Sequence, residues 1–183
     1  MQKEEEFRHL CTKENLNESE LARLHQVIED ETVDINYRNK SNAPIVLLCQ
    51  FYRGHNIYLT LKLFLKRKDL DIHSCSPSGY NALMFLCRFY YHNDLYDCVQ
   101  LLVEAGLDPE IKEKGGHNAL RLLCLNYTRK NLLDIALYLL YNSTNLEDVA
   151  KCPNYLWKRN FHQEANYFTK IYKKLLDGSD TVI

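Results

Sequence analysis

The residues most able to do chemistry in this chain are its seven cysteines and seven histidines. Four of the cysteines lie at nearly equal steps of 38, 38 and 37 residues, at Cys11, Cys49, Cys87 and Cys124. Thiolates act as nucleophiles and as metal ligands, so a regular series of thiols could mark a catalytic centre or a metal site. The residues around each cysteine decide between those functions and a structural role.

A zinc site typically needs closely spaced ligand pairs such as Cys-x2-Cys. The nearest pairs here are His9 with Cys11 and His73 with Cys75, and neither has that spacing or a matching second pair. His9 and His73 also occupy different positions within the repeating unit, so the two pairs would not come together around one metal ion. We therefore predict no metal site and no cofactor.

A nucleophilic cysteine needs a neighbouring base and a lowered pKa. Cys49, Cys87 and Cys124 each follow a leucine in an apolar stretch, which favours buried, inert thiols. The pair Gly115-Gly116 lacks the Lys-Ser or Lys-Thr that would complete a phosphate-binding loop. Since no nucleophile, base or cofactor motif is present, we expect a protein that is not an enzyme and has no catalytic residues.

Each of the four cysteines closes the same short phrase, which indicates a repeated structural unit. The phrases are Phe7–Cys11, Ile45–Cys49, Leu83–Cys87 and Leu120–Cys124. Their apolar residues at i, i+3 and i+4 lie on one side of a helix. A second marker recurs at steps of 37, at Asp34, Asp71, Asp108 and Asn145. A period of this length is typical of stacked helical repeats.

Between the two markers lies an amphipathic stretch that predicts a second helix in each unit. In the third unit Leu95, Cys98 and Leu101-Leu102 share one helical stripe, and the corresponding positions of the other units are largely apolar. Ser76-Pro77-Ser78-Gly79 and Lys114-Gly115-Gly116 contain the residues that favour turns. Each unit is therefore predicted to be a helix, a short loop, a second helix and an extended polar turn.

With this unit the chain resembles a divergent ankyrin-repeat protein with long repeats of about 37 residues. The segment Val99–Asp108 is similar to the second helix of that family and the turn that ends it. First helices start at Ala43-Pro44-Ile45, Asn81-Ala82-Leu83 and Asn118-Ala119-Leu120, which keep the leucine-type position of the family motif but lack its histidine. The surplus length falls around 89–93 and predicts a first helix longer by about one turn.

The resemblance implies an all-α, ankyrin-like solenoid of about four helix-turn-helix repeats in one domain over residues 1–176. The repeats cover approximately 5–38, 39–76, 77–113 and 114–150, a capping helix covers 153–176, and a flexible tail covers 177–183. Pro153 is expected in the first turn of the capping helix, where its missing N–H has no cost. Its apolar stripe would be Phe161, Ala165, Phe168, Tyr172 and Leu175.

Ankyrin-repeat proteins usually bind partners through a concave face made of the turn tips and the exposed side of each first helix. In this sequence the turn positions are Lys40, Asn42, Ser78, Tyr80, Lys114 and His117. The helical positions are Gln50, Phe51, Arg88, Phe89, Leu125 and Asn126. Tyr80, Arg88 and Phe89 are of the residue types that concentrate binding energy in interfaces.

Neighbouring aromatic residues also have a packing explanation. Tyr52, Tyr90 and Tyr127 recur at steps of 38 and 37, which favours a place in the core because repeats preserve core periodicity. Phe51 and Phe89 have no aromatic counterpart at Asn126, so they could either pack or bind.

The resemblance implies a protein-interaction module, such as an adaptor, inhibitor or scaffold, that regulates transcription, signalling or protein turnover. An odd number of cysteines without a secretory signal indicates reduced thiols, so we expect a cytoplasmic or nuclear protein. No apolar run approaches the roughly 18 residues of a membrane-spanning helix, and no membrane partner is expected.

Two further binding modes are open. Lys158, Arg159, Lys170, Lys173 and Lys174 are interleaved with tyrosines and a tryptophan, a mixture that could hold single-stranded nucleic acid or form a solvated cap. The alternative function is therefore a nucleic-acid-associated regulator. The last residues, Thr181, Val182 and Ile183, resemble the carboxyl-terminal ligands of PDZ domains.

Overall fold

The computed structural model describes residues 2–38, 42–143 and 146–177. Within these ranges the chain forms ten α-helices and no strand, which confirms the all-α class. The helices are α1 (Gln2–Cys11), α2 (Glu18–Glu29), α3 (Pro44–Phe51), α4 (Ile57–Lys66), α5 (Ala82–Phe89), α6 (Leu95–Glu104), α7 (Ala119–Asn126), α8 (Leu132–Tyr141), α9 (Leu146–Lys158) and α10 (His162–Leu176).

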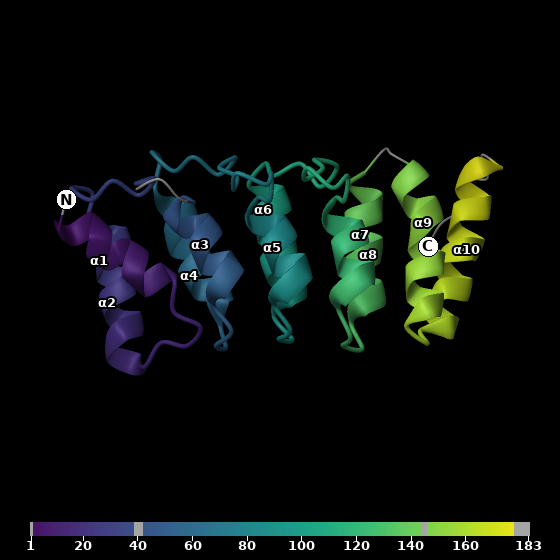
Figure 1. Cartoon of the computed structure of the whole chain (residues 1–183), viewed down its shortest axis with the longest axis horizontal. Helices are drawn as coiled ribbons and strands as arrows, with labels where there is room; N and C mark the ends of the chain where they lie inside the picture. Colours follow the sequence, from purple (N-terminus) through teal and green to yellow (C-terminus); the bar gives the residue numbers. More distant parts are fainter. Residues whose placement is uncertain (1, 39–41, 144–145, 178–183) are drawn as a thin grey trace.

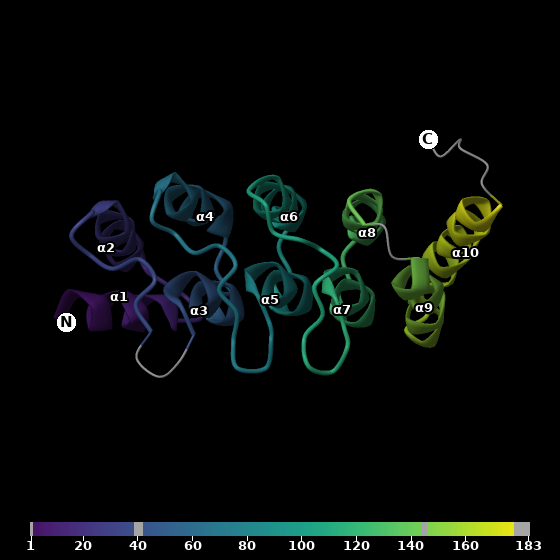
Figure 2. The same cartoon turned by 90° about the horizontal axis from the view of Figure 1, so that it is seen from above.

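The helices follow one another in pairs that stand side by side in chain order (Figure 1). Seen from above, α1, α3, α5, α7 and α9 form a first row, and α2, α4, α6 and α8 form a second row behind it (Figure 2). Each helix packs on its neighbours in its own row, as α5 does on α3 and α7, and the two rows meet between α1 and α2, α5 and α6, and α7 and α8. The apolar core is therefore a continuous layer between neighbouring pairs.

The first helices start where the sequence predicts them, because short-range caps fix their first turns. The side chains of Asn81 and Asn118 accept hydrogen bonds from the backbone N–H groups of Met84 and Arg121, at 2.9 and 3.0 Å. These bonds satisfy amide groups that have no partner inside the helix. In α3 the cap residue is Ala43, which makes no side-chain bond, and the helix starts instead with Pro44, whose ring favours the first helical position.

The end of the first helices differs from the prediction. We expected the surplus residues around 89–93 to lengthen the first helix, but α5 ends at Phe89 and the surplus forms the loop before α6. Tyr90 leaves the helix in an extended conformation, with φ −95° and ψ 122°. Its ring is completely buried, so the chain gains more from inserting this side chain into the core than from another helical turn.

The tyrosines at this position tie successive pairs together. The Tyr90 hydroxyl donates to the Asp94 carboxylate at 2.9 Å and accepts from the N–H of Ile57 in the preceding pair at 3.5 Å. The Tyr127 hydroxyl donates to Asn131 at 2.7 Å and lies 3.3 Å from the carbonyl oxygen of His92. Both rings are buried, as is Tyr52 at 5% exposure, which confirms the predicted packing role.

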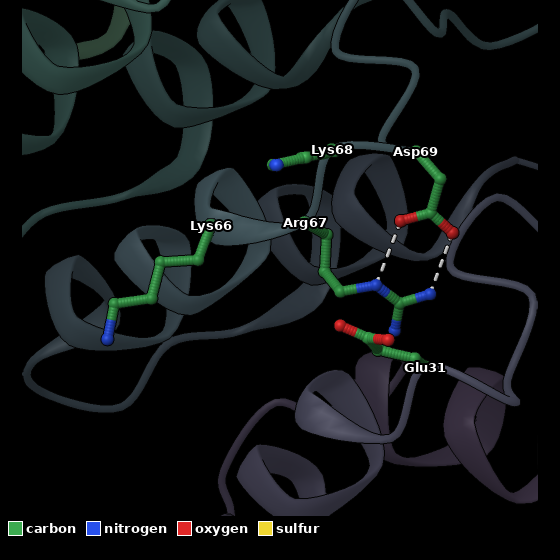
Figure 3. Close-up of a pocket in the computed structure, with 5 residues that line it drawn as sticks. All are labelled: Glu31, Lys66, Arg67, Lys68 and Asp69. Atoms are coloured by element: carbon green, nitrogen blue, oxygen red, sulfur yellow. Dashed lines mark hydrogen bonds and ion pairs between the residues drawn. The ribbon is translucent and has the colours of Figure 1, made fainter.

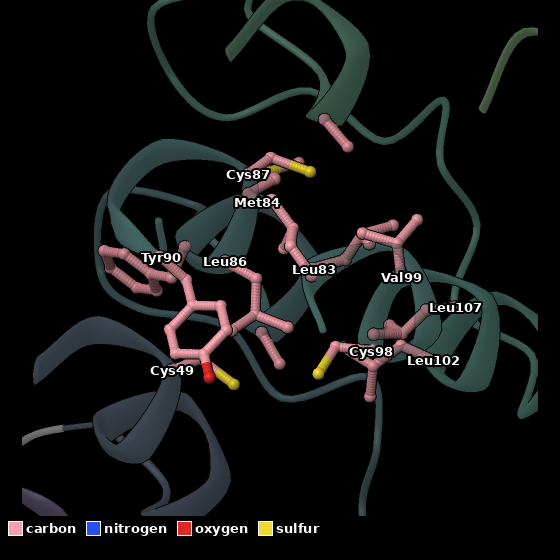
Figure 4. Close-up of a cluster of buried hydrophobic side chains, with 14 of the residues drawn as sticks. Cys49, Leu83, Met84, Leu86, Cys87, Tyr90, Cys98, Val99, Leu102 and Leu107 are labelled. Atoms are coloured by element: carbon pink, nitrogen blue, oxygen red, sulfur yellow. The ribbon is translucent and has the colours of Figure 1, made fainter. Parts of the chain in front are cut away.

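The cysteine series lies in the core, as its apolar surroundings predict. Cys11, Cys49, Cys87 and Cys124 have no exposed surface. Figure 4 shows Cys49, Cys87 and Cys98 among leucine, valine and tyrosine side chains. Burial raises the pKa of the Cys49 and Cys87 thiols far above the ordinary value, so both stay protonated and unreactive.

The second helix of the third pair ends in the turn that the sequence match predicts. Gly106 has a φ of +103°, a conformation that glycine adopts without strain. The N–H groups of Gly106 and Leu107 donate to the carbonyl groups of Val103 and Leu102, at 2.9 and 3.0 Å. This pattern satisfies the last carbonyls of α6 and directs Leu107 into the core.

The carboxyl-terminal cap is a pair of helices, so the prediction of one helix starting at Pro153 is wrong. Pro153 lies in the middle of α9, which begins at Leu146 and continues to Lys158. Asn160, with a φ of +65°, reverses the chain before α10. The predicted boundaries at 150 and 153 therefore fall inside one helix.

Both cap helices are amphipathic. Val149, Cys152 and Leu156 are buried on one stripe of α9, which packs on α7. In α10 Ala165 and Phe168 of the predicted stripe are buried, while Phe161, Tyr172 and Leu175 are half-buried against the core. Ile171, which the predicted stripe omitted, is also buried. α10 packs chiefly on α9 and ends the stack.

Candidate partner-binding site

One side of the stack is built from the first row and the turns that precede it. The turns before α5 and α7 project beyond the first row, on the side away from the second row (Figure 2). We call the outer sides of α3, α5 and α7, together with these turns, the first-row face. It holds the described members of the predicted partner-binding set except Asn42, which lies just before α3.

The centre of the first-row face is a cluster of stacked rings and guanidinium groups. The rings of Tyr80 and Phe85 lie 5.0 Å apart, and those of Phe85 and Phe89 lie 6.1 Å apart, between centroids. The Arg88 guanidinium lies 4.9 Å from the Phe89 ring, and that of Arg53 lies 5.2 Å from it. We call these five residues the arginine–aromatic cluster.

Local structure positions each member of this cluster. Phe85 and Phe89 are four residues apart in α5, so they share one side of the helix. Tyr80 lies one residue before the α5 cap, and its hydroxyl accepts a hydrogen bond from Arg88. Arg53 follows the end of α3, and its guanidinium donates to the carbonyl groups of Gln50 and Tyr52, at 2.5 and 2.8 Å.

The structure brings Tyr80, Arg88 and Phe89 together, as the resemblance implies, but they are half-buried rather than fully exposed. The cause is Phe85, a ring at 6% exposure on which both Tyr80 and Phe89 stack. Replacing all three residues by alanine would therefore disturb packing as well as binding. Sequence reasoning missed Arg53, whose only local signal is its place directly after the α3 cap.

The remaining predicted residues lie on both flanks of the cluster. Asn42 donates to Gln50 at 2.8 Å, beside the half-buried Phe51. Ser78 and Lys114 are exposed at the tips of two successive turns, which are joined by a 3.0 Å bond from the Lys114 N–H to the Ser78 carbonyl. Leu125 and Asn126 are half-buried on α7, and Lys40 lies outside the described residues.

His117 belongs to a turn organised by a buried carboxylate. Glu113 accepts hydrogen bonds from the N–H of Gly115 at 2.6 Å, and from the N–H and Nδ1 of His117 at 3.0 and 2.8 Å. Burial opposes the charge of Glu113, but these hydrogen bonds outweigh it and lower its pKa. His117 therefore has a structural partner and only part of its ring is open to a ligand.

A second buried acid joins the fourth pair to the cap. Asp148 is completely buried and lies 3.0 Å from the Lys112 ammonium and 3.5 Å from the Arg121 guanidinium. Asn118 donates to it at 3.1 Å, and Arg121 also donates to the Tyr155 hydroxyl at 2.8 Å. Arg121 is thus held by the fold, and no spacing in the sequence indicates this network.

The predicted nucleic-acid-binding set separates into two groups. Lys158, Lys170, Lys173 and Lys174 are exposed on α9 and α10. Arg159 instead donates to the carbonyl groups of Cys124, Asn126 and Tyr127, at 2.7, 3.1 and 2.9 Å. Because this guanidinium satisfies the end of α7, Arg159 is removed from the predicted set. The residues Thr181–Ile183 lie outside the described part of the chain.

No protein-family model matches the chain, and no curated protein matches it.

A pocket of about 380 Å³ lies where α2 and α4 end, lined by Glu31, Lys66, Arg67, Lys68 and Asp69. Figure 3 shows the Arg67 guanidinium directed toward Asp69, whereas Lys66 extends away. Arg67 donates to the carbonyls of Ile28, Asp30 and Val33, and twice to Asp69. All five guanidinium N–H donors are therefore used within the protein, and this pocket has a structural arginine rather than a ligand-binding one.

Metal sites and membrane-spanning helices were two further possibilities raised by the sequence. Within residues 2–38, 42–143 and 146–177, no group of three histidine, cysteine, aspartate or glutamate side chains could hold a metal ion. In the same part of the chain, every helix is too short or too polar to cross a bilayer.

Proposed function

We propose that this chain is a divergent ankyrin-like repeat module that binds another protein through its first-row face. In this proposal it is a solenoid of four repeats with a helix-pair cap, and it acts as an adaptor, inhibitor or scaffold rather than as an enzyme. The paired helices in two rows and the recurring cysteine phrase support the repeat interpretation. A role in transcription, signalling or protein turnover in the cytoplasm or nucleus is part of the same proposal.

The observation that carries this proposal is the arginine–aromatic cluster at the centre of the face. Arginine and tyrosine are enriched among interface residues that lose most affinity on truncation. Tyr80, Arg88 and Phe89 are half-buried, and their stacking and hydrogen bonding hold them in place before any partner arrives. Side chains fixed in this way lose less conformational entropy on binding than mobile surface residues do.

The flanking residues suit the rim of such an interface. Ser78 and Lys114 at the turn tips are polar and exposed, and Asn42, Gln50 and Asn126 present amide groups beside the helices. Interfaces commonly combine an apolar or aromatic centre with a polar rim that excludes water. We assign the cluster to the centre and these polar residues to the rim.

The proposal predicts that affinity capture from the native cell, followed by mass spectrometry, recovers a protein partner. Arg88→Ala and Phe89→Ala should each reduce its recovery and weaken its binding by about ten-fold or more, as expected for central interface residues. A matched control is the double variant Tyr58→Ala/Lys62→Ala on α4, in the second row. It removes a cation–aromatic pair in which the Lys62 ammonium lies 5.4 Å from the centre of the Tyr58 ring. This control should bind as the wild type does.

Circular dichroism separates loss of contact from loss of fold in these variants. If Arg88→Ala and Phe89→Ala keep the wild-type helicity and still capture the partner at full affinity, the first-row face is not the binding site. Equal losses in the α4 control would likewise contradict the proposal, because they would show that binding does not depend on this face.

A nucleic-acid-associated role is the second candidate, favoured by the aromatic pair at the cap. The Trp157 ring is 53% exposed and stacks on His162 with a centroid distance of 4.4 Å, next to the exposed Lys158. An exposed ring beside a cation can stack on a nucleobase. Quantifying RNA in the same affinity eluate, at low and high salt, distinguishes this role, because phosphate binding falls steeply with salt.

A further inference from the structure

Charge is segregated along this chain in step with its pairs of helices. The segments 36–56, 72–93 and 114–133 contain no aspartate or glutamate. They include α3, α5 and α7 and the loops that flank these helices. The acids of the third unit instead lie at its second helix and the turn after it, at Asp94, Asp97, Glu104, Asp108, Glu110 and Glu113. The first-row face therefore has more basic than acidic side chains, with Glu113 as a buried acid in the turn before α7, although the whole chain has a net charge of −1.

Two arginines on this face meet at one aromatic ring. The guanidinium carbons of Arg53 and Arg88 lie 5.2 and 4.9 Å from the centre of the Phe89 ring. Within the described residues neither forms an ion pair, in contrast to Arg23, which is paired with Glu6 at 2.8 Å. A carboxylate bound at this ring would supply the charged partner that both guanidinium groups lack there.

Both guanidinium groups retain hydrogen-bonding capacity. A guanidinium has five N–H donors. Arg88 uses one donor on the Tyr80 hydroxyl, and Arg53 uses donors on the carbonyls of Gln50 and Tyr52. Stacking on a ring uses the flat face of the guanidinium and leaves its N–H edge for acceptors, which is the edge that pairs with carboxylates in a bidentate manner.

From this geometry we infer that the first-row face binds an acidic peptide segment of the partner protein, with a carboxylate at Arg53 and Arg88 and an apolar side chain against Phe89. This inference rests on the proposed function and names the chemistry of its partner. The physical reason is charge complementarity, since a face that carries Arg53, Arg88 and Lys114 and the buried acid Glu113 attracts an acidic segment and rejects a basic one.

A nucleic acid fits this cluster less well than a peptide does. Single-stranded nucleic acids need open aromatic rings on which bases can stack. Here the rings of Tyr80, Phe85 and Phe89 stack on one another, and those of Tyr80 and Phe89 are also covered by the guanidinium groups. The cluster therefore offers hydrogen-bond donors and a ring edge rather than a stacking platform.

The test is a selection from a random phage-displayed peptide library on the purified full chain. We expect selected peptides to contain aspartate and glutamate about two-fold or more above the input library, next to apolar residues. Arg53→Gln and Arg88→Gln should each weaken the best peptide by about ten-fold or more, measured by fluorescence anisotropy, because each removes a charge-assisted contact. Lys66→Gln, an equal charge change at an exposed site on α4, should leave binding unchanged.

Other outcomes would overturn the inference. Selection of neutral or basic peptides, failure to select any peptide, or binding that is unaffected by both arginine substitutions would each do so. Stronger competition for this face by a single-stranded oligonucleotide would assign it to nucleic acid instead. If the binding of neutral peptides or of the captured partner depends on Phe89 but not on the arginines, the proposed protein-binding function is retained and only the inferred specificity for acidic peptides is wrong. If the affinity capture also recovers no partner, both the proposed function and the inferred specificity are wrong.

Discussion

The cysteines show how the surroundings of a residue decide its chemistry. Cys49 and Cys87 have the same thiol as any catalytic cysteine, yet burial raises the pKa of both far above the ordinary value and keeps them protonated. Arg88 illustrates the opposite case, because its hydrogen bond to Tyr80 and its contact with Phe89 leave it at the surface with donors to spare. The fold therefore decides which side chains are available to a ligand, whatever their intrinsic reactivity.

This contrast predicts the thiol reactivity of the native protein. Cys75 is exposed, whereas the other six cysteines are buried. Titration with an aromatic disulfide at pH 8 should show one fast-reacting thiol, and the remaining thiols should react only on unfolding. Cys75→Ser should abolish the fast phase, and Cys87→Ser should retain it. Two or more fast thiols in the folded wild type would contradict the buried placement of the series.

At the scale of the helices, two arginines act as caps for a helix in an earlier part of the stack. Arg67, at the end of α4, donates to the carbonyls of Ile28, Asp30 and Val33 where α2 ends. Arg159, after α9, does the same for the end of α7. The last carbonyls of a helix have no partner inside it and carry a partial negative charge, so a guanidinium satisfies them well. These contacts connect neighbouring helices within each row.

Arg67→Lys should lower the free energy of unfolding by about 2 kcal/mol, because lysine has three donors on a single nitrogen and cannot span these carbonyls. Urea unfolding followed by circular dichroism measures the change. Arg23→Lys is the matched control, since Arg23 also makes paired bonds, to Glu6, but its side chain is 44% exposed. The control substitution should lower the free energy of unfolding by less than about 1 kcal/mol. An equal loss of unfolding free energy in the two variants would contradict the capping role of Arg67.

At the scale of the whole molecule, neighbouring pairs of helices cover one another's apolar sides. The stripe of Val149, Cys152 and Leu156 on α9 covers α7, and fully buried aliphatic side chains contribute about 1.5–3 kcal/mol each. Asp148 adds polar contacts to Asn118, Arg121 and Lys112 across the same boundary. The cap is therefore part of the core and not an appendage.

A chain that ends at Ser143 should unfold at lower urea concentration and associate in solution, because the apolar side of α7 becomes exposed. Light scattering coupled to size exclusion and urea unfolding measure the two effects. A chain that ends at Leu176 keeps both cap helices and serves as the control, with stability expected to equal that of the full chain. A monomeric, fully stable product from the shorter chain would show that α9 and α10 are dispensable.

Periodicity determined much of this protein from the sequence alone. The phrase that ends in Cys49, Cys87 or Cys124 predicts a buried helix wherever it occurs, and Asn81 and Asn118 mark helix starts through contacts only three residues long. Such features follow from local geometry, so spacing along the chain is sufficient to reveal them.

The tertiary structure decided which polar side chains are available. Lys158 and Arg159 are adjacent basic residues, yet one is exposed and the other is bonded to three carbonyls at the end of α7, more than 30 residues away. Arg53 and Phe89 are likewise distant in sequence and meet only because α3 packs on α5. Long-range hydrogen bonds and ring contacts of this kind leave no regular spacing in the sequence, so the proposed site became visible only when the helices were stacked.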